Sequence, residues 1–172
     1  TVVLWSDGYT NAAANITARG GVQGGAGGMV ETSGKQTLVT SAAPMVHSRD
    51  GVSPHGQWLL DPESLTIVAT LSSPPAQAPS PSTNNYESGG VASEVTSATL
   101  ATALNSGANV VLYTSGALGT VSFNDSVLSA PTADAALQVY AHGGITLGAN
   151  TIGIAAGPPP AGKLSILLQA GY

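Results

Sequence analysis

Charged residues are scarce in this chain. Four Lys and Arg and nine Asp and Glu make up 8% of its 172 residues, whereas about 25% is usual in globular proteins. The four basic residues, Arg19, Lys35, Arg49 and Lys163, are scattered along the sequence. Binding to nucleic acid or to anionic lipid needs clustered Lys and Arg. We therefore expect neither as a partner.

Cysteine is absent altogether, which excludes disulfides, thiolate metal sites and a cysteine nucleophile. A chain without thiols is suited to crossing an oxidising periplasm unfolded, because it cannot form wrong disulfide links. Long apolar runs are also missing, since none approaches the roughly 20 residues that a membrane-spanning helix needs. The polar content comes instead from Ser, Thr, Asn and Gln, so we expect a largely neutral, hydrogen-bonding surface.

What the sequence does contain is a series of short segments in which apolar and small polar residues alternate. Examples are VVLW at 2–5, TLVT at 37–40, LTIV at 65–68 and LQVYA at 137–141. Gly, Asn, Asp, Ser and Pro, which favour turns, lie between them. This pattern predicts an all-β fold.

The spacing of these segments favours a right-handed parallel β-helix over other all-β folds. Apolar positions recur at intervals of roughly 20 to 27 residues, the expected length of one coil, as in Val121 and Ile145, Val127 and Ile152, and Ile16 and Leu38. Three short strands in a turn of this length would stack equivalent positions from coil to coil around an apolar column. An antiparallel sandwich, with a strand about every 8 to 12 residues, is the alternative fold that could produce similar spacing.

Two segments interrupt the repeat of an otherwise single β-helix segment over 1–172. The stretch 72–85 is rich in proline, which cannot donate to a strand ladder, and it predicts an exposed loop or insertion. The stretch 93–105 has apolar residues near helical spacing, with Ser93 as a candidate N-cap and Gly107 just beyond the end. We predict one short helix there.

Two motifs in the first half carry a family resemblance. The first is a glycine-rich run that leads into MVETSGK, within ITARGGVQGGAGGMVETSGKQTL at 16–38, and the second is GQWLLDPESLTI at 56–67. Together they resemble the filamentous haemagglutinin family, large secreted proteins of Gram-negative bacteria. Met29 stands where the family usually has Phe. The residues that carry the resemblance are Gly27, Gly28, Val30, Glu31, Gly34, Trp58, Leu59, Leu60, Asp61 and Pro62.

Physical chemistry gives these motif residues structural roles. The glycines would permit tight corners and close stacking of coils. Trp58, Leu59 and Leu60 supply bulk to fill a coil interior, whereas Asp61 and Pro62 favour a turn. For Glu31 we expect a structural role such as bonding turn amides.

The resemblance implies a right-handed parallel β-helix that is exported through an outer-membrane secretion partner and is secreted or displayed on the cell surface as an adhesin or fibre. It implies no catalytic residues. We also expect no cofactor. The secretion domain of the family is missing, so we expect a segment of a longer protein. The expected partner is a host or bacterial surface receptor or glycan, which the sequence does not identify.

The candidate chemical sites are few. His47 and His55 lie near Arg49 and Asp50, so a metal pair or an acid–base site is conceivable, but we favour histidines without a ligand and predict no metal site. Asp61 and Glu63 are the two acidic residues nearest to each other in the sequence, and such a pair could serve in glycoside cleavage. The turn at Pro62 gives Asp61 a structural role instead.

Aromatic residues could stack on sugar rings. We expect Trp5 and Trp58 to be core residues or plugs at a coil end. Tyr86, beside the proline-rich stretch, is the candidate for an exposed glycan contact.

The leading hypothesis is a noncatalytic secreted or surface protein, a β-helical adhesin or fibre segment. One alternative is a homo-oligomer in which coils stack head to tail into an extracellular filament, because VVLW and LSILLQ at the two ends are strand-like and uncapped. A less favoured alternative is a β-helical polysaccharide-cleaving enzyme.

Overall fold

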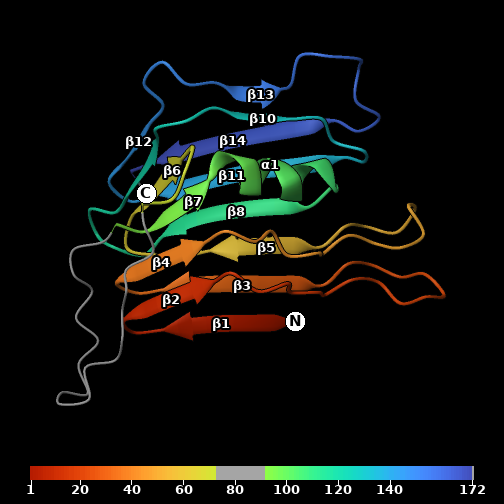
Figure 1. Cartoon of the computed structure of the whole chain (residues 1–172), viewed down its shortest axis with the longest axis horizontal. Helices are drawn as coiled ribbons and strands as arrows, with labels where there is room; N and C mark the ends of the chain where they lie inside the picture. Colours follow the sequence, from red (N-terminus) through yellow and green to blue (C-terminus); the bar gives the residue numbers. More distant parts are fainter. Residues whose placement is uncertain (73–91, 172) are drawn as a thin grey trace.

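The chain folds into a parallel β-helix of about five turns, as the sequence predicts. A computed structural model describes residues 1–72 and 92–171 (Figure 1). All strand pairings between its named strands are parallel. The predicted loop over 72–85 and the candidate glycan contact Tyr86 lie, apart from Ser72, outside the described residues.

Two six-stranded sheets form the two long faces of the coil, and most turns contribute one strand to each sheet. The strands of the first sheet, here called sheet A, are in spatial order β1 (Val2–Ser6), β3 (Met29–Gly34), β5 (Gln57–Leu60), β8 (Asn109–Thr114), β11 (Ala135–Ala141) and β14 (Leu164–Ala170). Those of sheet B are β2 (Tyr9–Ala12), β4 (Thr37–Thr40), β7 (Glu94–Thr96), β6 (Leu65–Val68), β9 (Thr120–Phe123) and β12 (Gly144–Thr146).

The third face is less regular. In the later turns it is a two-stranded sheet of β10 (Val127–Ser129) and β13 (Ile152–Ile154). In the first two turns it is reduced to a single parallel bridge between Thr17 and Met45. The helix α1 (Ser97–Asn105) packs against β10 and takes the place of a strand on this face in the third turn (Figure 1).

The register of sheet A gives the relative length of each turn. Val2 pairs with Val30 and Val30 with Trp58, so the first two turns are equally long. Trp58 pairs with Val110, which makes the third turn nearly twice as long. Val110 pairs in turn with Leu137, and the length of the first turns is restored. The third turn therefore contains an insertion.

Part of this insertion returns to the coil as β7. This strand lies between β4 and β6 in sheet B, out of sequence order. Glu94 pairs with both Val39 and Thr66, and its carboxylate accepts hydrogen bonds from the amide and hydroxyl of Ser72 at 2.7 Å each. The insertion thus adds one strand to sheet B, which otherwise has one strand per turn.

The helix begins later than the sequence predicts. Ser93 is not its N-cap, because residues 94–96 fill the gap between β4 and β6, and the Ser93 hydroxyl accepts the amide of Leu38 at 3.0 Å. Thr96 caps the helix instead, accepting the amide of Thr99 at 3.1 Å. At the other end Gly107 has a φ of +86°, which favours glycine.

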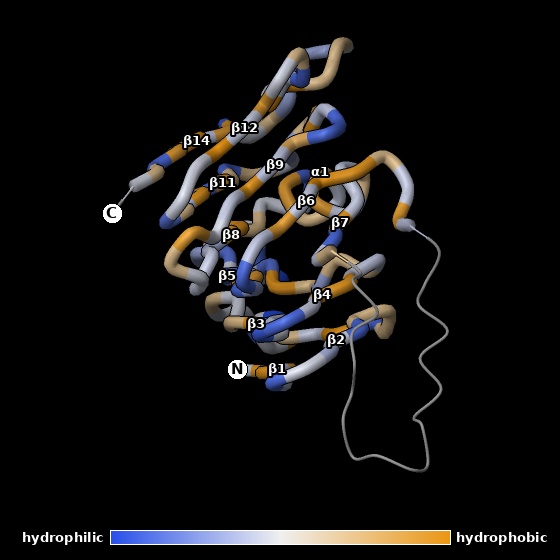
Figure 2. The backbone as a smooth tube through the Cα atoms, turned by 90° about the vertical axis from the view of Figure 1, so that its left-hand side faces the viewer, coloured by the Kyte–Doolittle hydropathy of each residue, from blue (hydrophilic) through white to orange (hydrophobic). Residues whose placement is uncertain are grey.

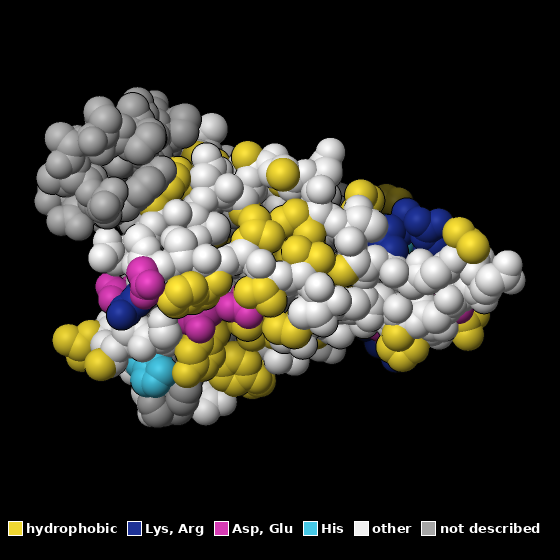
Figure 3. Space-filling model, turned by 90° about the horizontal axis from the view of Figure 1, so that it is seen from below, with side chains coloured by type: hydrophobic (Ala, Val, Ile, Leu, Met, Phe, Trp, Pro, Cys, Tyr) yellow, Lys and Arg dark blue, Asp and Glu magenta, His cyan; other side chains and the backbone are white. Residues whose placement is uncertain are grey.

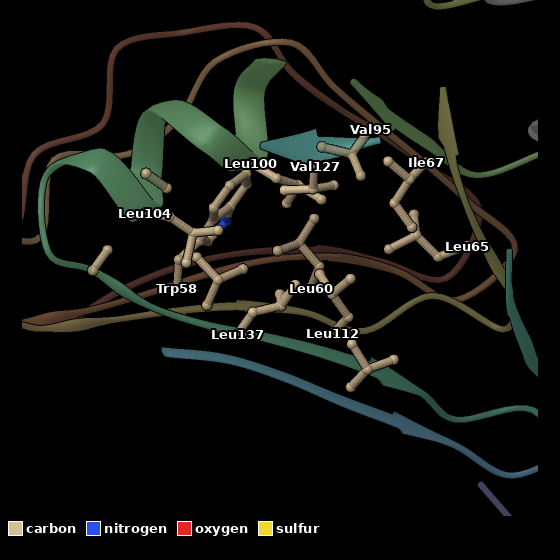
Figure 4. Packing of buried hydrophobic residues seen from close by; sticks show 14 of the residues in the cluster. Trp58, Leu60, Leu65, Ile67, Val95, Leu100, Leu104, Leu112, Val127 and Leu137 are labelled. Atoms are coloured by element: carbon tan, nitrogen blue, oxygen red, sulfur yellow. The ribbon is translucent and has the colours of Figure 1, made fainter. Parts of the chain in front are cut away.

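A narrow apolar column fills the coil (Figure 4). The stacked turns that enclose it are seen in Figure 2. In sheet A the in-register set Val30, Trp58, Val110 and Leu137 is fully buried. Because side chains alternate along a strand, Leu59 points outward and is half-buried, so the expectation that it fills the interior is wrong. The Trp58 indole N–H donates to the Thr32 hydroxyl at 2.9 Å inside the column.

Some of the stacking pairs inferred from spacing are correct and others are not. Val121 pairs with Ile145, and Val127 with Ile152, as their spacing predicts. Leu38 pairs with Thr10 rather than stacking on Ile16. The error arises because each turn buries apolar residues on more than one face, so two residues that are nearly one turn apart can lie on different faces.

Glycines of both motifs lie where the chain passes close to other backbone atoms. A Cβ atom at Gly27 would overlap the carbonyl oxygen of Val46, and one at Gly56 would overlap that of Gly28. At Gly28 a Cβ atom would lie 3.1 Å from Ala18, and at Gly34 it would overlap the Thr37 carbonyl oxygen.

The described part of the chain contains no helix of sufficient length and apolarity to cross a bilayer.

Replacing a corner glycine should therefore make the coil easier to unfold. We expect Gly27→Ala to lower the free energy of unfolding by about 1–3 kcal/mol, the usual range for forcing atoms into a packed site. Gly144→Ala is the matched control, because nothing lies within 4 Å of a Cβ atom there. Urea denaturation of the two variants checks this, and equal stability would contradict the close approach.

Candidate functional site

A hollow of about 370 Å³ lies at the corner between sheets A and B. Its lining extends from the corner after β1 to the corner after β8. We call it the Trp5 hollow, and its lining residues are Trp5, Asp7, Lys35, Asp61, Glu63, Ser115 and Gly116.

The same corner of four successive turns supplies these residues. Asp7 follows β1, Lys35 follows β3, Asp61 follows β5 and Ser115 follows β8. Backbone hydrogen bonds link the corners, with the Lys35 amide donating to Ser6 at 2.9 Å and the Ser115 amide donating to Pro62 at 3.2 Å. Residues far apart in the sequence are thereby brought together by the stacking of the coils.

Trp5 is the exposed aromatic residue of the hollow. Its side chain is 55% exposed on the outer face of β1, so the expectation of a core residue is wrong for Trp5, whereas Trp58 is fully buried. Inward and outward positions alternate along β1, and Val2 and Leu4 take the inward ones. Ser33, the register partner of Trp5, is fully buried.

Asp61 is the half-buried acid of the hollow, whereas Asp7 and Glu63 are exposed. It follows the buried Leu60, and its amide donates to the Ser33 hydroxyl at 3.2 Å. Burial raises the pKa of its carboxyl group, and the negative charge of Glu31 raises this pKa further, although bonding with Ser115 and the charge of His142 act in the opposite direction. Its Oδ1 atom is buried and has no hydrogen-bond partner among the described residues.

Glu31 does not have the role that the sequence suggests. It lies in the middle of β3, half-buried on the outer face, between its register partners Val3 and Leu59. In the described ranges, 1–72 and 92–171, its carboxylate makes no hydrogen bond to a turn amide. Its effect is electrostatic, because it acts on Asp61.

The chemistry of the hollow is that of a polar binding site with one aromatic wall. An indole can stack on the apolar face of a sugar ring, and carboxylate, ammonium and hydroxyl groups can bond its hydroxyls. Within the described part of the chain no three His, Asp or Glu side chains are grouped so as to hold a metal ion.

Sequence reasoning does not find this site. It pairs Asp61 with Glu63, but nothing in the sequence links Asp7 and Lys35 to that pair. One signal could have revealed the site, because each of these residues lies in the turn that follows a strand of sheet A. Asp7 and Lys35, for example, follow two strands that pair in register one turn apart.

Two tyrosines continue the outer face of sheet A beyond the hollow. Tyr113 in β8 pairs in register with Tyr140 in β11, and the Tyr113 ring meets the edge of His142 with 5.8 Å between ring centroids. The His142 ring is fixed in turn by contact of its Nδ1 with the Thr114 carbonyl oxygen at 2.7 Å. This face is therefore lined with aromatic groups on an ordered framework.

Comparison with known proteins gives no relative for this chain. No protein-family model matches it, and no curated protein or solved structure is significantly similar to it.

The raised pKa of Asp61 predicts a specific dependence of stability on pH. An unfolded Asp has a pKa of about 3.9, so the folded state holds the proton of Asp61 more tightly. Its contribution to stability is then present below about pH 4 and falls as pH rises through the folded pKa. Asp61→Asn should remove this decline, which urea denaturation across a range of pH would measure.

Asp50 supplies a control of opposite sign. Hydrogen bonds from the side chain and amide of Ser53 and the amide of Val52 lower its pKa. Its contribution is therefore present above about pH 4 and is lost as pH falls. If Asp50→Asn and Asp61→Asn changed the pH profile in the same direction, the assignment for Asp61 would be wrong.

Proposed function

We propose that this chain is a noncatalytic β-helical segment of a secreted or cell-surface adhesin, and that it binds a surface glycan through the Trp5 hollow. The observation that carries the proposal is the exposed Trp5 side chain beside carboxylate, ammonium and hydroxyl groups. Burying a tryptophan is normally favourable, so one left on the outer face of a strand is available for a ligand.

The sequence motifs and the fold support the extracellular part of this proposal. The two motifs resemble the filamentous haemagglutinin family, and a parallel β-helix is the fold that this resemblance implies. Export through an outer-membrane partner in a Gram-negative bacterium is compatible with the absence of cysteine. A long, rigid coil also suits a fibre, because each turn adds length by repeating the same backbone contacts.

The ligand class follows from the lining of the hollow. Three carboxylates and one ammonium group, from Asp7, Asp61, Glu63 and Lys35, make the hollow net negative. Sulfate or carboxylate groups on a ligand would be repelled by this charge. We therefore favour a neutral saccharide, such as a hexose or N-acetylhexosamine unit.

Trp5→Ala tests glycan binding. We expect the affinity for a bound neutral saccharide to fall about threefold to tenfold, since an aromatic stacking contact contributes about 0.5–1.5 kcal/mol. Val3→Ala is the matched control, because Val3 is equally exposed on the same face of β1 at 56%. A glycan array followed by calorimetry would measure both variants.

The same experiment tests the noncatalytic part of the proposal. The parent chain should release no reducing ends from the saccharides that it binds. Release that Asp61→Asn abolishes would instead favour the polysaccharide-cleaving alternative, in which a carboxyl group of raised pKa acts as the general acid. Equal affinity of Trp5→Ala, Val3→Ala and the parent would overturn the role of the hollow.

A second candidate function is head-to-tail assembly of the chain into a filament. The strand β14 pairs with β11 on one side only, and its residues Ile166, Leu167 and Leu168 are 43%, 45% and 39% exposed. The opposite edge of sheet A is β1, which also carries exposed apolar side chains at Val3 and Trp5. The edge of β1 in a second copy could therefore extend the ladder of β14, and repetition of this contact would give an open filament.

Charge on β14 should prevent this assembly. Leu167→Lys places an ammonium group on the exposed edge and should shift the chain from filaments or oligomers to monomers. Thr102→Lys is the control, because it adds the same charge at an exposed polar position of α1, which belongs to neither edge strand. Sedimentation velocity at increasing concentration measures the effect, and a parent chain that stays monomeric throughout would rule out assembly.

A further inference from the structure

Two arginines and two histidines gather at the corner that leads from the third face into sheet A. Arg19 lies before β3, and His47, Arg49 and His55 lie before β5 one turn later. Backbone hydrogen bonds hold these two loops together, including Ala18 to Met45 at 2.9 Å and Gly27 to Pro54 at 2.9 Å. We call these four side chains the corner cluster.

The members of the corner cluster act on one another electrostatically. Burial lowers the pKa of His47, and the positive charges of Arg19, His55 and Arg49 lower it further. Every charge that acts appreciably on His47 is thus cationic. Two of the four basic residues, Arg19 and Arg49, thus belong to this corner although they are far apart in the sequence. Figure 3 shows Lys and Arg atoms at separate places toward opposite ends of the face in view.

Three nitrogen atoms of the cluster lack partners. Arg19 Nε, His47 Nδ1 and His55 Nδ1 are buried, and none makes a hydrogen bond to the described residues. Across those residues, neither Arg19 nor Arg49 forms an ion pair with a carboxylate. Buried polar groups are satisfied in most proteins, so unpaired groups in neighbouring loops indicate that a water molecule or ion binds there.

The acids nearest to the cluster are engaged elsewhere. Asp50 accepts the amides of Val52 and Ser53 at 3.0 and 2.9 Å and the Ser53 hydroxyl at 2.7 Å. Asp134, which shares a second hollow with His55, accepts the Lys163 amide at 2.9 Å. Both carboxylates are thus committed to loop amides.

The charge of the cluster selects the kind of ligand. Two imidazoles can hold a divalent metal ion, but the guanidinium charges of Arg19 and Arg49, which both act on His47, would repel it. The same guanidinium groups match the oxygens of a sulfate or phosphate group, which also accept hydrogen bonds from the N–H group of an imidazole. We infer that the corner cluster binds an oxyanion, the sulfate or phosphate group of an anionic ligand, at a site separate from the Trp5 hollow.

NMR titration of the histidine rings with sodium sulfate and sodium phosphate tests this inference. Against sodium chloride of equal ionic strength, the resonances of His47 and His55 should shift saturably. Those of His142, which lies at the far corner of the coil beside Tyr113, should not shift. Glucose 6-sulfate and glucose 6-phosphate, compared with glucose, then show whether an ester binds better than the free ion.

Arg49→Gln is the decisive variant because Arg49 is exposed and its loss should leave the fold intact. We expect sulfate affinity to fall roughly tenfold, the size of one charge-assisted hydrogen bond. Lys35→Gln removes the same charge at the Trp5 hollow and should leave sulfate affinity unchanged.

Several results would overturn the inference. These are a shift that chloride reproduces, a shift that does not saturate, or equal losses in Arg49→Gln and Lys35→Gln, any of which would mean charge screening alone. The inference does not depend on glycan binding. Trp5→Ala should therefore retain the full response to sulfate even if it loses a neutral saccharide.

Discussion

The parallel backbone ladder between successive coils is the interaction on which the rest of this structure depends. Each inner strand of sheet A bonds the strand one turn earlier and the strand one turn later, and this fixes which side chains stack. Because side chains alternate across a strand, a shift of one residue would exchange the buried column for the outer face. The close approach at Gly27 and Gly56 helps to set this register, since larger residues would push the coils apart.

The insertion in the third turn tests how strongly the ladder constrains the fold. The chain leaves sheet B after β6 and returns as β7 between β4 and β6, yet sheet A continues from β5 to β8 without a gap. The helix α1 closes the third face of that turn and buries Leu100 and Leu104 against the column. One sheet can therefore gain a strand while the other keeps its regular order.

Function in such a fold depends on the corners and the outer face, because the interior is filled with side chains. The Trp5 hollow and the corner cluster are each built from loops of successive turns. One is net negative with an aromatic wall, and the other is cationic with unpaired nitrogen atoms. These opposite characters would let a single rigid segment contact two chemically different groups, one neutral and one anionic.

Local sequence patterns are sufficient to determine the class of fold. Alternating segments and turn residues predict an all-β fold, and the spacing of the segments favours parallel coils over an antiparallel sandwich. The same spacing identifies the pairs Val121 with Ile145 and Val127 with Ile152. The glycines of the first motif and the buried Trp58 also lie where tight corners and a filled column require them. These features depend on short-range preferences and on burial, which single residues carry.

Only the tertiary structure decided the register of the first half, the start of α1 and both candidate sites. Ser93 could have capped a helix, but the open position in sheet B drew residues 94–96 into a strand. Trp5 lies outside, against expectation, because its position along β1 faces away from the column. Arg19 and His47, like Asp7 and Lys35, become neighbours through coil stacking. The sequence determined what each turn is made of, whereas the backbone ladder between turns determined which residues meet.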